Sequence, residues 1–176
     1  YTVTFNLNGT NATYKDGTTT AKTKQYTFSD ATDPVMMANL TDNYLAIRPG
    51  YTFLGYYDKQ TTTGAKQYFD ANGKAQSRFD KTSATTLYAC WQANDYSIDY
   101  STATDKGWTL ETGVPTSYTT ESTTTLLGAT KTGYTFKGWK VLSITDDSEN
   151  VLTTGTYGGW TVGQTYIKNY VVEGNY

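Results

Sequence analysis

The heptapeptide Gly50-Tyr51-Thr52-Phe53-Leu54-Gly55-Tyr56 occurs a second time as Gly133-Tyr134-Thr135-Phe136-Lys137-Gly138-Trp139. Tyr51 and Tyr134 stand 83 positions apart (134 − 51 = 83). In both copies aromatic residues alternate with polar or small ones, a pattern that predicts a β-strand with one buried face. The chain is therefore expected to be a tandem repeat in which this strand occurs once per unit.

A similar opening precedes each copy of the heptapeptide. Tyr1-Thr2-Val3-Thr4-Phe5 opens the first half and Tyr96-Ser97-Ile98-Asp99-Tyr100 opens the second, 95 positions later (96 − 1 = 95). The second copy has thus lost about a dozen residues between its opening and its heptapeptide, a change typical of connecting segments. Two units are predicted, 1–94 and 95–176, with Asn94-Asp95 forming a junction too short for a flexible linker.

Composition narrows the class of protein. The 176 residues carry 14 basic and 16 acidic side chains without basic clusters, which argues against nucleic acid as a partner. No apolar run approaches the roughly 20 residues of a membrane span, so no membrane insertion is expected in this segment. The 17 Tyr, 6 Phe and 4 Trp supply a core, and the abundance of Thr and Tyr predicts a mainly β fold, of the α+β type if a short helix is present.

In the first unit, period-two patterns and turn residues predict four strands and one short helix. The strands are expected at 1–7, before an Asn8-Gly9 turn, at 22–28, at 51–57 and at 85–91. The stretch 58–79 is polar and rich in turn residues, and Asn72-Gly73 in it is a candidate hairpin turn. Tyr26 and Phe28 are expected to point inward. Residues 35–40 are predicted to be helical, because Pro34 suits a first helical position and Asp30 or Asp33 suits a cap.

In the second unit, strands are expected at 96–100, 134–144 and 165–172, with a polar tip at 146–149. The stretch 116–127 is rich in Ser and Thr, which disfavour helix interiors, so the helix there is expected to shrink to a turn.

The two heptapeptides are expected to play the same structural part. Tyr51 and Phe53 in the first copy, and Tyr134 and Phe136 in the second, are predicted to occupy equivalent core positions, since each pair lies on one face of its strand.

The glycines of the heptapeptide are expected to serve the backbone. Gly50 and Gly133 suit a turn with positive φ, while Gly55 and Gly138 inside the strand suggest a bulge or a close backbone contact.

Three motifs in fixed order, Tyr-x-Val-x-Phe-x-x-Asn-Gly at 1–9, Arg-Pro-Gly-Tyr-Thr-Phe-x-Gly-Tyr at 48–56 and Leu-Tyr-Ala-x-Trp at 87–91, resemble the Listeria–Bacteroides repeat, also called the internalin B-repeat family. The second half is similar through 115–118 and 133–139 but lacks the Leu-Tyr-Ala-x-Trp motif. The resemblance implies tandem β-grasp-like units, each a small mixed sheet with one short helix or turn. It further implies repeats of exported bacterial surface proteins and adhesins, which act as stalk or interaction modules rather than as enzymes.

Residues suited to catalysis or metal binding are sparse. The chain has no His, so no catalytic, cofactor or metal site is expected, and the single Cys90 in an apolar run is expected to be a small buried hydrophobe. Two groups of carboxylates, Asp30 with Asp33 and those at 146–149, keep a chemical role open as an alternative. A helix cap and a solvated hairpin tip explain these more simply than paired acid–base groups or a calcium loop.

Exposed aromatic residues are the remaining route to a ligand. Tyr57, Trp108, Tyr157 and Trp160 are candidates for ligand contact, because each is expected in a loop or on an outward strand face. For each of them packing in the core is the commoner role.

The sequence favours a non-enzymatic repeat module of an extracellular bacterial cell-surface protein, acting as a stalk or spacer or in adhesion. Its partner would be a protein or glycan of a host or of the cell envelope. Because the chain starts at Tyr1, an export signal and an anchor are expected outside it. The alternative is a carbohydrate-binding module whose exposed Tyr and Trp rings line a groove. A hydrolase fragment, the third class, would need carboxylates that converge in a pocket.

Overall fold

A computed structural model describes residues 1–176. The chain forms two compact units, Tyr1–Gln92 (unit 1) and Ala93–Tyr176 (unit 2), whereas the sequence placed the boundary after Asn94. It is mainly β. Helical structure is confined to the α-helix α1 (Ser101–Asp105) and the 3-10 helix η1 (Asp42–Tyr44).

Unit 1 contains seven strands: β1 (Thr2–Asn6), β2 (Thr13–Tyr14), β3 (Lys22–Gln25), β4 (Ala46–Ile47), β5 (Tyr51–Tyr57), β6 (Gln67–Asp70) and β7 (Thr85–Ala93). Unit 2 contains twelve strands of two residues each: β8 (Tyr96–Ser97), β9 (Thr109–Leu110), β10 (Ser117–Tyr118), β11 (Thr124–Thr125), β12 (Ala129–Thr130), β13 (Trp139–Lys140), β14 (Ile144–Thr145), β15 (Val151–Leu152), β16 (Thr156–Tyr157), β17 (Trp160–Thr161), β18 (Thr165–Tyr166) and β19 (Val171–Val172).

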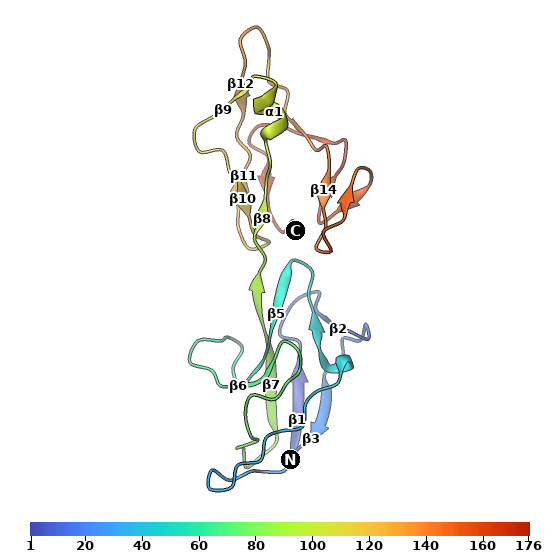
Figure 1. Cartoon of the computed structure of the whole chain (residues 1–176), viewed down its shortest axis with the longest axis vertical. Coiled ribbons are helices and arrows are strands. Elements are labelled where there is room, and N and C mark those ends of the chain that lie inside the picture. Colours follow the sequence, from blue (N-terminus) through green and yellow to red (C-terminus); the bar gives the residue numbers. More distant parts are fainter. The chain divides into compact units, whose positions relative to one another are not determined.

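A five-stranded mixed sheet of order β3-β1-β7-β5-β6 organises unit 1 (Figure 1). β1 and β7, the first and last strands of the unit along the sequence, are neighbours in this sheet and run parallel. Val3 lies opposite Thr85 and Phe5 opposite Leu87. A parallel pair requires a long crossover connection. Here the chain between the two strands provides it and also contributes β3, antiparallel to β1, and the β5–β6 hairpin.

Aromatic side chains fill the core of unit 1. Phe5 is fully buried and its ring centroid lies 5.2 Å from Tyr44, 5.0 Å from Tyr56 and 5.8 Å from Phe69. The period-two pattern predicted for the opening strand is confirmed, since Val3 and Phe5 are buried while their neighbours are not.

The helix predicted at 35–40 is absent, and that prediction was wrong. Residue 35 follows a loop, and the backbone N–H groups of Met37 and Leu40 donate across the unit to the carbonyls of Ser77 (3.3 Å) and Gly73 (2.8 Å). A helix this short forms only with tertiary support, and here the segment at 73–77 offers the backbone other partners. The segment therefore runs without a helix, with Met37 and Leu40 buried.

Because no helix forms at 35–40, the two residues expected to cap it, Asp30 and Asp33, do not act as caps. The Asp30 carboxylate accepts the backbone N–H of Thr32 at 2.9 Å, which closes a local turn, and the Val35 N–H is capped instead by Ser29 Oγ at 2.7 Å. Asp33 is exposed.

Phe28 is 41% exposed, so its predicted inward orientation was wrong. The ladder of β3 ends at Gln25, and beyond Tyr26, which is buried, the alternation stops. Ser29 points inward instead, and its N–H donates to the carbonyl of Phe79 at 2.8 Å.

The region 58–79, which looked mainly polar, contains β6 with the fully buried Tyr68 and Phe69. The turn expected at Asn72-Gly73 is present: Gly73 has φ 75°, and its N–H donates to the carbonyl of Asp70 at 3.0 Å.

Unit 2 has much shorter ladders than predicted. The expected strand 134–144 is reduced to β13 and the start of β14, 96–100 to β8, and 165–172 to β18 and β19. The stretch 116–127 contains no helix, and a turn closes where the Ser122 N–H donates to the Thr119 carbonyl at 3.2 Å. Four buried side chains form its core, Tyr118, Leu126, Tyr166 and Val172.

The proposed equivalence of core positions is only partly right. Tyr51, Phe53 and Phe136 are half-buried, whereas Tyr134 is 65% exposed. The residue of the heptapeptide that reaches the centre of unit 1 is Tyr56, which is fully buried.

Several local contacts of unit 1 nevertheless recur in unit 2 at the 83-residue spacing of the heptapeptides. The Tyr56 hydroxyl donates to the carbonyl of Tyr44 at 2.7 Å, and the Trp139 indole N–H donates to the carbonyl of Leu127 at 2.6 Å. Each donor thereby ties the strand after the turn to the segment before it.

Ring contacts recur in the same way. Phe53 meets Tyr56 edge-on at 5.1 Å, and Phe136 meets Trp139 edge-on at 5.0 Å.

The backbone pairing that precedes the heptapeptide also recurs. β2 pairs with β4 in unit 1 and β9 pairs with β12 in unit 2, in both cases antiparallel over two residues. Ala46 of β4 and Ala129 of β12 are both buried. The same small residue thus occupies the same place in both units.

The glycines have the backbone conformations that the sequence predicted. Gly50 and Gly133 have φ 78° and 79°. Gly55 and Gly138 have φ 118° and 136° and lie against a neighbouring strand: a Cβ on Gly55 would overlap the Phe69 carbonyl, and one on Gly138 would lie 2.7 Å from that of Tyr166.

Candidate functional site

The four aromatic candidates are divided between the two units. Tyr57 lies at the end of β5 in unit 1, opposite Gln67, while Trp108, Tyr157 and Trp160 belong to unit 2. All four are half-buried. No ring contact joins any two of the three in unit 2.

Trp160 belongs to the core of unit 2. Its indole N–H donates to the hydroxyl of Tyr118 at 2.7 Å, and its ring meets Tyr166 edge-on at 5.0 Å. Tyr157 packs against Tyr176 and donates its hydroxyl to Asp147 at 3.1 Å. Both rings are occupied by the protein itself.

Trp108 packs against two rings of the second heptapeptide. Its ring lies 6.1 Å from that of Tyr134 and 6.0 Å from that of Phe136. The Lys131 ammonium lies over the Tyr134 ring at 4.7 Å and donates to the carbonyl of Lys106 at 2.6 Å. We call Trp108, Lys131, Tyr134 and Phe136 cluster 2.

A matching group lies in unit 1. The Arg48 guanidinium carbon lies 3.6 Å from the centroid of the Tyr51 ring, and Phe53 packs on Trp91 at 5.4 Å. We call Arg48, Tyr51, Phe53 and Trp91 cluster 1. Its cation, Tyr and Phe precede those of cluster 2 by 83 positions each.

The turn of the heptapeptide brings each cation onto its tyrosine. The Tyr51 N–H donates to the Arg48 carbonyl at 3.1 Å, and the Tyr134 N–H donates to the Lys131 carbonyl at 3.0 Å. Because a glycine with positive φ stands third in this four-residue turn, the first and fourth side chains are brought close together.

A glycine from the stretch between the first two strands of each unit lies beside each cation. A Cβ on Gly9 would lie 3.0 Å from Arg48 Cδ and 3.2 Å from Trp91 Nε1. A Cβ on Gly107 would lie 3.9 Å from Lys131 Cε.

Sequence reasoning found Trp108 but missed the cations and Tyr134. The signal was present in both copies: a basic residue stands three positions before the tyrosine, at Arg48 and at Lys131.

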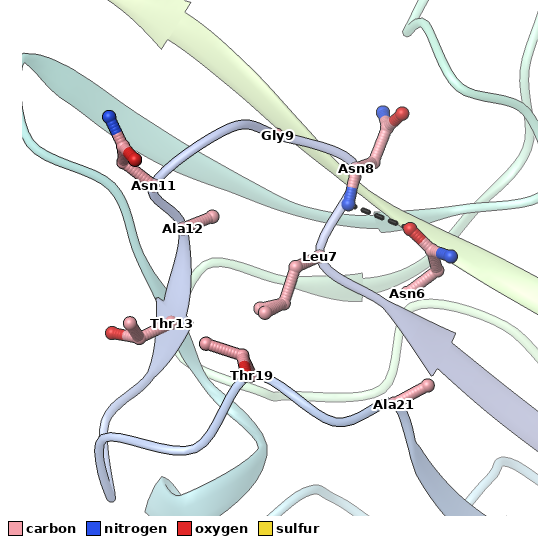
Figure 2. Close-up of a pocket in the computed structure, with 9 residues that line it drawn as sticks. All are labelled: Asn6, Leu7, Asn8, Gly9, Asn11, Ala12, Thr13, Thr19 and Ala21. Atoms are coloured by element: carbon pink, nitrogen blue, oxygen red, sulfur yellow. Dashed lines mark hydrogen bonds between the residues drawn. The ribbon is translucent and has the colours of Figure 1, made fainter.

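A pocket of about 690 Å³ opens at the end of β1, lined by Asn6, Leu7, Asn8, Gly9, Asn11, Ala12, Thr13, Thr19 and Ala21 (Figure 2). No titratable or aromatic side chain lines it. The Asn8 amide is engaged elsewhere, since it donates to the carbonyls of Ala89 (2.9 Å) and Gln60 (2.8 Å). The pocket offers hydrogen bonds and small apolar groups but no acid–base chemistry.

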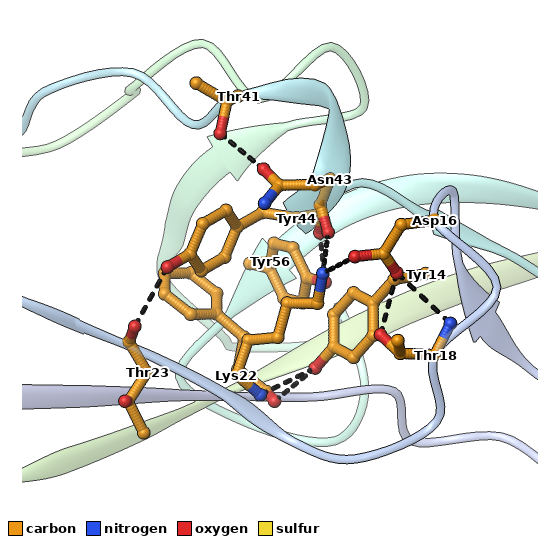
Figure 3. Close-up of polar contacts among 10 residues, drawn as sticks. Tyr14, Asp16, Thr18, Lys22, Thr23, Thr41, Asn43, Tyr44 and Tyr56 are labelled. Atoms are coloured by element: carbon orange, nitrogen blue, oxygen red, sulfur yellow. Dashed lines mark hydrogen bonds and ion pairs between the residues drawn. The ribbon is translucent and has the colours of Figure 1, made fainter.

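A polar network surrounds Lys22 in unit 1 (Figure 3). The Lys22 ammonium donates to the Asp16 carboxylate and, at 2.5 Å, to the carbonyl of Asn43, and it lies 4.8 Å from the centre of the Tyr14 ring. Hydrogen bonds from Lys22 and, next in size, from Thr18 lower the pKa of Asp16 to about 2. Lys22 thus connects the loop after β2, strand β3 and η1.

A second group of charges lies around Tyr68. The Asp80 carboxylate accepts Lys66 Nζ at 2.6 Å and the Tyr68 hydroxyl, while Lys81 Nζ lies 3.2 Å from Asp58. Partial burial acts to raise the pKa of Asp80, but the hydrogen bonds from Lys66 and Tyr68 outweigh it and hold that pKa at about 2. The carboxylates of Asp58 and Asp80 are thus each paired with a lysine.

The remaining candidates for chemistry are also engaged in structure. The Asp146 carboxylate accepts the N–H groups of Ser148 (2.9 Å) and Asn150 (2.8 Å), which closes the hairpin tip between β14 and β15. Cys90 is buried, and burial raises the pKa of its thiol to about 11. No three His, Cys, Asp or Glu side chains gather where they could hold a metal ion.

No helix in the structure has the length and hydrophobicity that crossing a membrane requires. The chain matches no protein-family profile, and neither a curated protein nor a solved structure matches it significantly.

Proposed function

We propose that this chain is a non-enzymatic repeat module of an extracellular bacterial cell-surface protein, serving as a spacer or in adhesion. The observation that carries the proposal is the recurrence of local contacts at one spacing. The hydrogen bonds from Tyr56 to Tyr44 and from Trp139 to Leu127 are the clearest pair. Repetition of a whole unit suits reach or multivalent binding, whereas an active site gains little from being duplicated in one chain.

The proposal includes tandem β-grasp-like units of the Listeria–Bacteroides, or internalin B-repeat, type. The mixed sheet of unit 1, with parallel β1 and β7 at its centre, supports this assignment, as do the three ordered motifs of the first half. The place of the short helix is taken by the segment 35–40, which forms no helix, and by η1. Unit 2 is the divergent copy, with two-residue ladders.

The proposed location is tested on intact cells of the producing organism. An antibody raised against the purified chain should label unpermeabilised cells, and external protease should remove the label while a cytoplasmic marker survives. Labelling that requires permeabilisation would contradict a surface location.

The proposed role is tested in the full-length protein. If the module is a spacer, replacing it with an unrelated folded segment of similar length should preserve adhesion of the cells, and deleting it should reduce adhesion. If the module itself binds, the replacement should reduce adhesion as much as the deletion. Full adhesion after deletion would contradict both roles.

A carbohydrate-binding module is the alternative function. Tyr157 and Trp160 pack against rings of unit 2 itself, which weighs against an aromatic groove formed by them. The observation in its favour is cluster 2, where Trp108 lies beside the largely exposed ring of Tyr134. Binding of the purified chain to a panel of immobilised glycans would separate this role from that of a passive spacer.

A further inference from the structure

Clusters 1 and 2 share features that the heptapeptide turn alone does not require. The turn accounts for the stacking of Arg48 on Tyr51 and of Lys131 on Tyr134. It does not account for the tryptophan that packs on the phenylalanine in each cluster.

The two tryptophans come from different parts of their units. Trp91 stands near the end of the last strand of unit 1, whereas Trp108 stands directly before β9, near the start of unit 2. Unit 2 lacks a Leu-Tyr-Ala-x-Trp segment, yet an indole still packs on Phe136, at 6.0 Å. The composition of the cluster is thus kept although the chain supplies one ring from a new position.

The cations of both clusters lack acidic partners. Neither Arg48 nor Lys131 belongs to any of the five ion pairs of the chain. Arg48 Nε is buried and has no hydrogen-bond partner. Because Nε is closed off from solvent while Arg48 as a whole is only half-buried, an anion would be met by the two terminal guanidinium nitrogens, which can present two parallel N–H donors to a carboxylate.

The rings of both clusters retain accessible surface. Tyr51, Phe53 and Trp91 are half-buried in cluster 1. In cluster 2, Trp108 and Phe136 are half-buried and Tyr134 is 65% exposed. An aromatic face beside an unpaired cation suits a ligand that combines an apolar ring face with a negative charge.

We propose that clusters 1 and 2 are two copies of one binding site for an acidic saccharide, a sugar whose ring carries a carboxylate. The proposal deepens the adhesion branch of the proposed function and names its ligand class. In each copy the cation pairs with the carboxylate and the neighbouring rings contact the apolar face of the sugar. Because Arg binds carboxylates with two donors and Lys with a point charge, the site in unit 1 is the tighter one.

The test is isothermal titration calorimetry of the full chain with a tetramer of galacturonic acid. Two sites per chain are expected, with an affinity that falls as salt is added. Methyl-esterifying the carboxylates keeps the sugar and removes the charge, and should weaken binding by about tenfold or more, since the charge-assisted hydrogen bonds are lost. Polyglutamate carries the charge without the ring and should bind more weakly than the tetramer.

Variants assign the sites. Lys131→Gln or Tyr134→Ala should leave one site. Tyr134 is exposed and Lys131 is half-buried, so the fold should persist with a melting profile shifted by no more than a surface substitution shifts it. Arg48→Gln should remove the other site, and Arg48→Lys should restore weaker binding there. Lys74→Gln, at an exposed lysine outside both clusters, is the matched control and should bind as the unmodified chain does.

Three results would each overturn the proposal: no binding of the acidic tetramer at millimolar concentration, equal binding of its methyl ester or of polyglutamate, or unchanged binding in Lys131→Gln and Tyr134→Ala. The titration uses purified protein and is independent of where the protein resides in the cell. Failure here would therefore leave the surface location and the spacer role standing.

Discussion

At the scale of single residues, glycine shows most directly how this sequence specifies its backbone. Gly55 combines φ 118° with close contact to the backbone of β6, and the register between β5 and β6 shifts at the next residue pair, Tyr56/Tyr57. A side chain at this position is excluded both by the dihedral angle and by the neighbouring carbonyl. The glycine is therefore part of the strand pairing.

We expect Gly55→Ala to destabilise unit 1 strongly, because relieving the overlap with the Phe69 carbonyl requires the β5–β6 pair to separate. Gly17→Ala is the matched control: Gly17 also has positive φ, 82°, but nothing lies within 4 Å of its Cβ position. The control should cost only the left-handed conformation, about 1–2 kcal/mol. Urea unfolding monitored by circular dichroism measures both, and equal losses would show that the close contact is unimportant.

Cys90 should behave as an inert core residue. With its pKa raised to about 11 by burial, the thiol is almost entirely protonated at pH 8 and is shielded from reagents. A thiol-reactive disulfide reagent should label the native chain slowly and the chain in denaturant at once. Rapid labelling of the native chain would contradict the burial of Cys90.

At the scale of elements, the long-range partners of a segment decide whether its local propensity is realised. The segment 35–40 has helical propensity, yet the N–H groups of Met37 and Leu40 donate to carbonyls in the segment 73–77. Beyond β3 the Ser29 N–H likewise donates to a distant carbonyl, that of Phe79. The alternation of buried and exposed side chains stops there, and Phe28 is exposed. Whether a side chain beyond the end of a strand is buried therefore depends on its tertiary contacts and not on the alternation within the strand.

Substitutions of two phenylalanines test whether tertiary contacts decide which side chains are buried. Phe5→Ala should cost about 3–5 kcal/mol, because Phe5 is fully buried among aromatic rings. Phe28→Ala should change stability by less than about 1 kcal/mol, because Phe28 lies outside the core. Chemical unfolding of both variants decides the matter, and a loss at Phe28 as large as that at Phe5 would restore the inward orientation that the sequence predicted.

The charge group around Tyr68 makes the stability of unit 1 dependent on pH. The pKa of Asp80 is about 2 in the folded chain against an ordinary value of 3.8, so the folded state favours the ionised form. The resulting stabilisation is fully present above about pH 4 and is lost as the pH falls toward 2.

Asp80→Asn should therefore lower the urea midpoint of unit 1 at pH 6 and flatten its decline between pH 4 and pH 2. The exposed Asp33, changed to Asn, serves as the control and should leave the profile unchanged. An Asp80→Asn profile parallel to that of the unmodified chain would show that the Lys66–Asp80 pair has no role in the pH dependence.

At the scale of the whole molecule, the chain has two separate cores of very different size. Unit 1 has an extensive aromatic core around a five-stranded sheet, whereas unit 2 has a buried cluster of four side chains and two-residue ladders. Because stability scales with buried apolar area, the two units should differ in stability.

We expect calorimetry to resolve two transitions, with unit 2 melting at the lower temperature. Gly55→Ala should shift only the upper transition and Gly138→Ala only the lower one, since Gly138 has φ 136° and lies against the backbone of Tyr166 in unit 2. A single transition that moves with either substitution would show that the units unfold together.

The sequence by itself determined the features that depend on local pattern. The strands at 2–6 and 51–57, the turn at Asn72-Gly73 and the positive φ of Gly50 and Gly133 follow from period-two alternation and from backbone positions that only glycine occupies readily.

Tertiary structure alone decided the rest. It buried Tyr68 and Phe69 in a stretch that looked polar, drew the backbone of 35–40 toward 73–77, exposed Tyr134 and brought Trp108 onto Phe136. The physical reason is that each of these outcomes depends on contacts between segments far apart in the chain. Such contacts supply hydrogen bonds and apolar surface that outweigh the small local preferences of short segments.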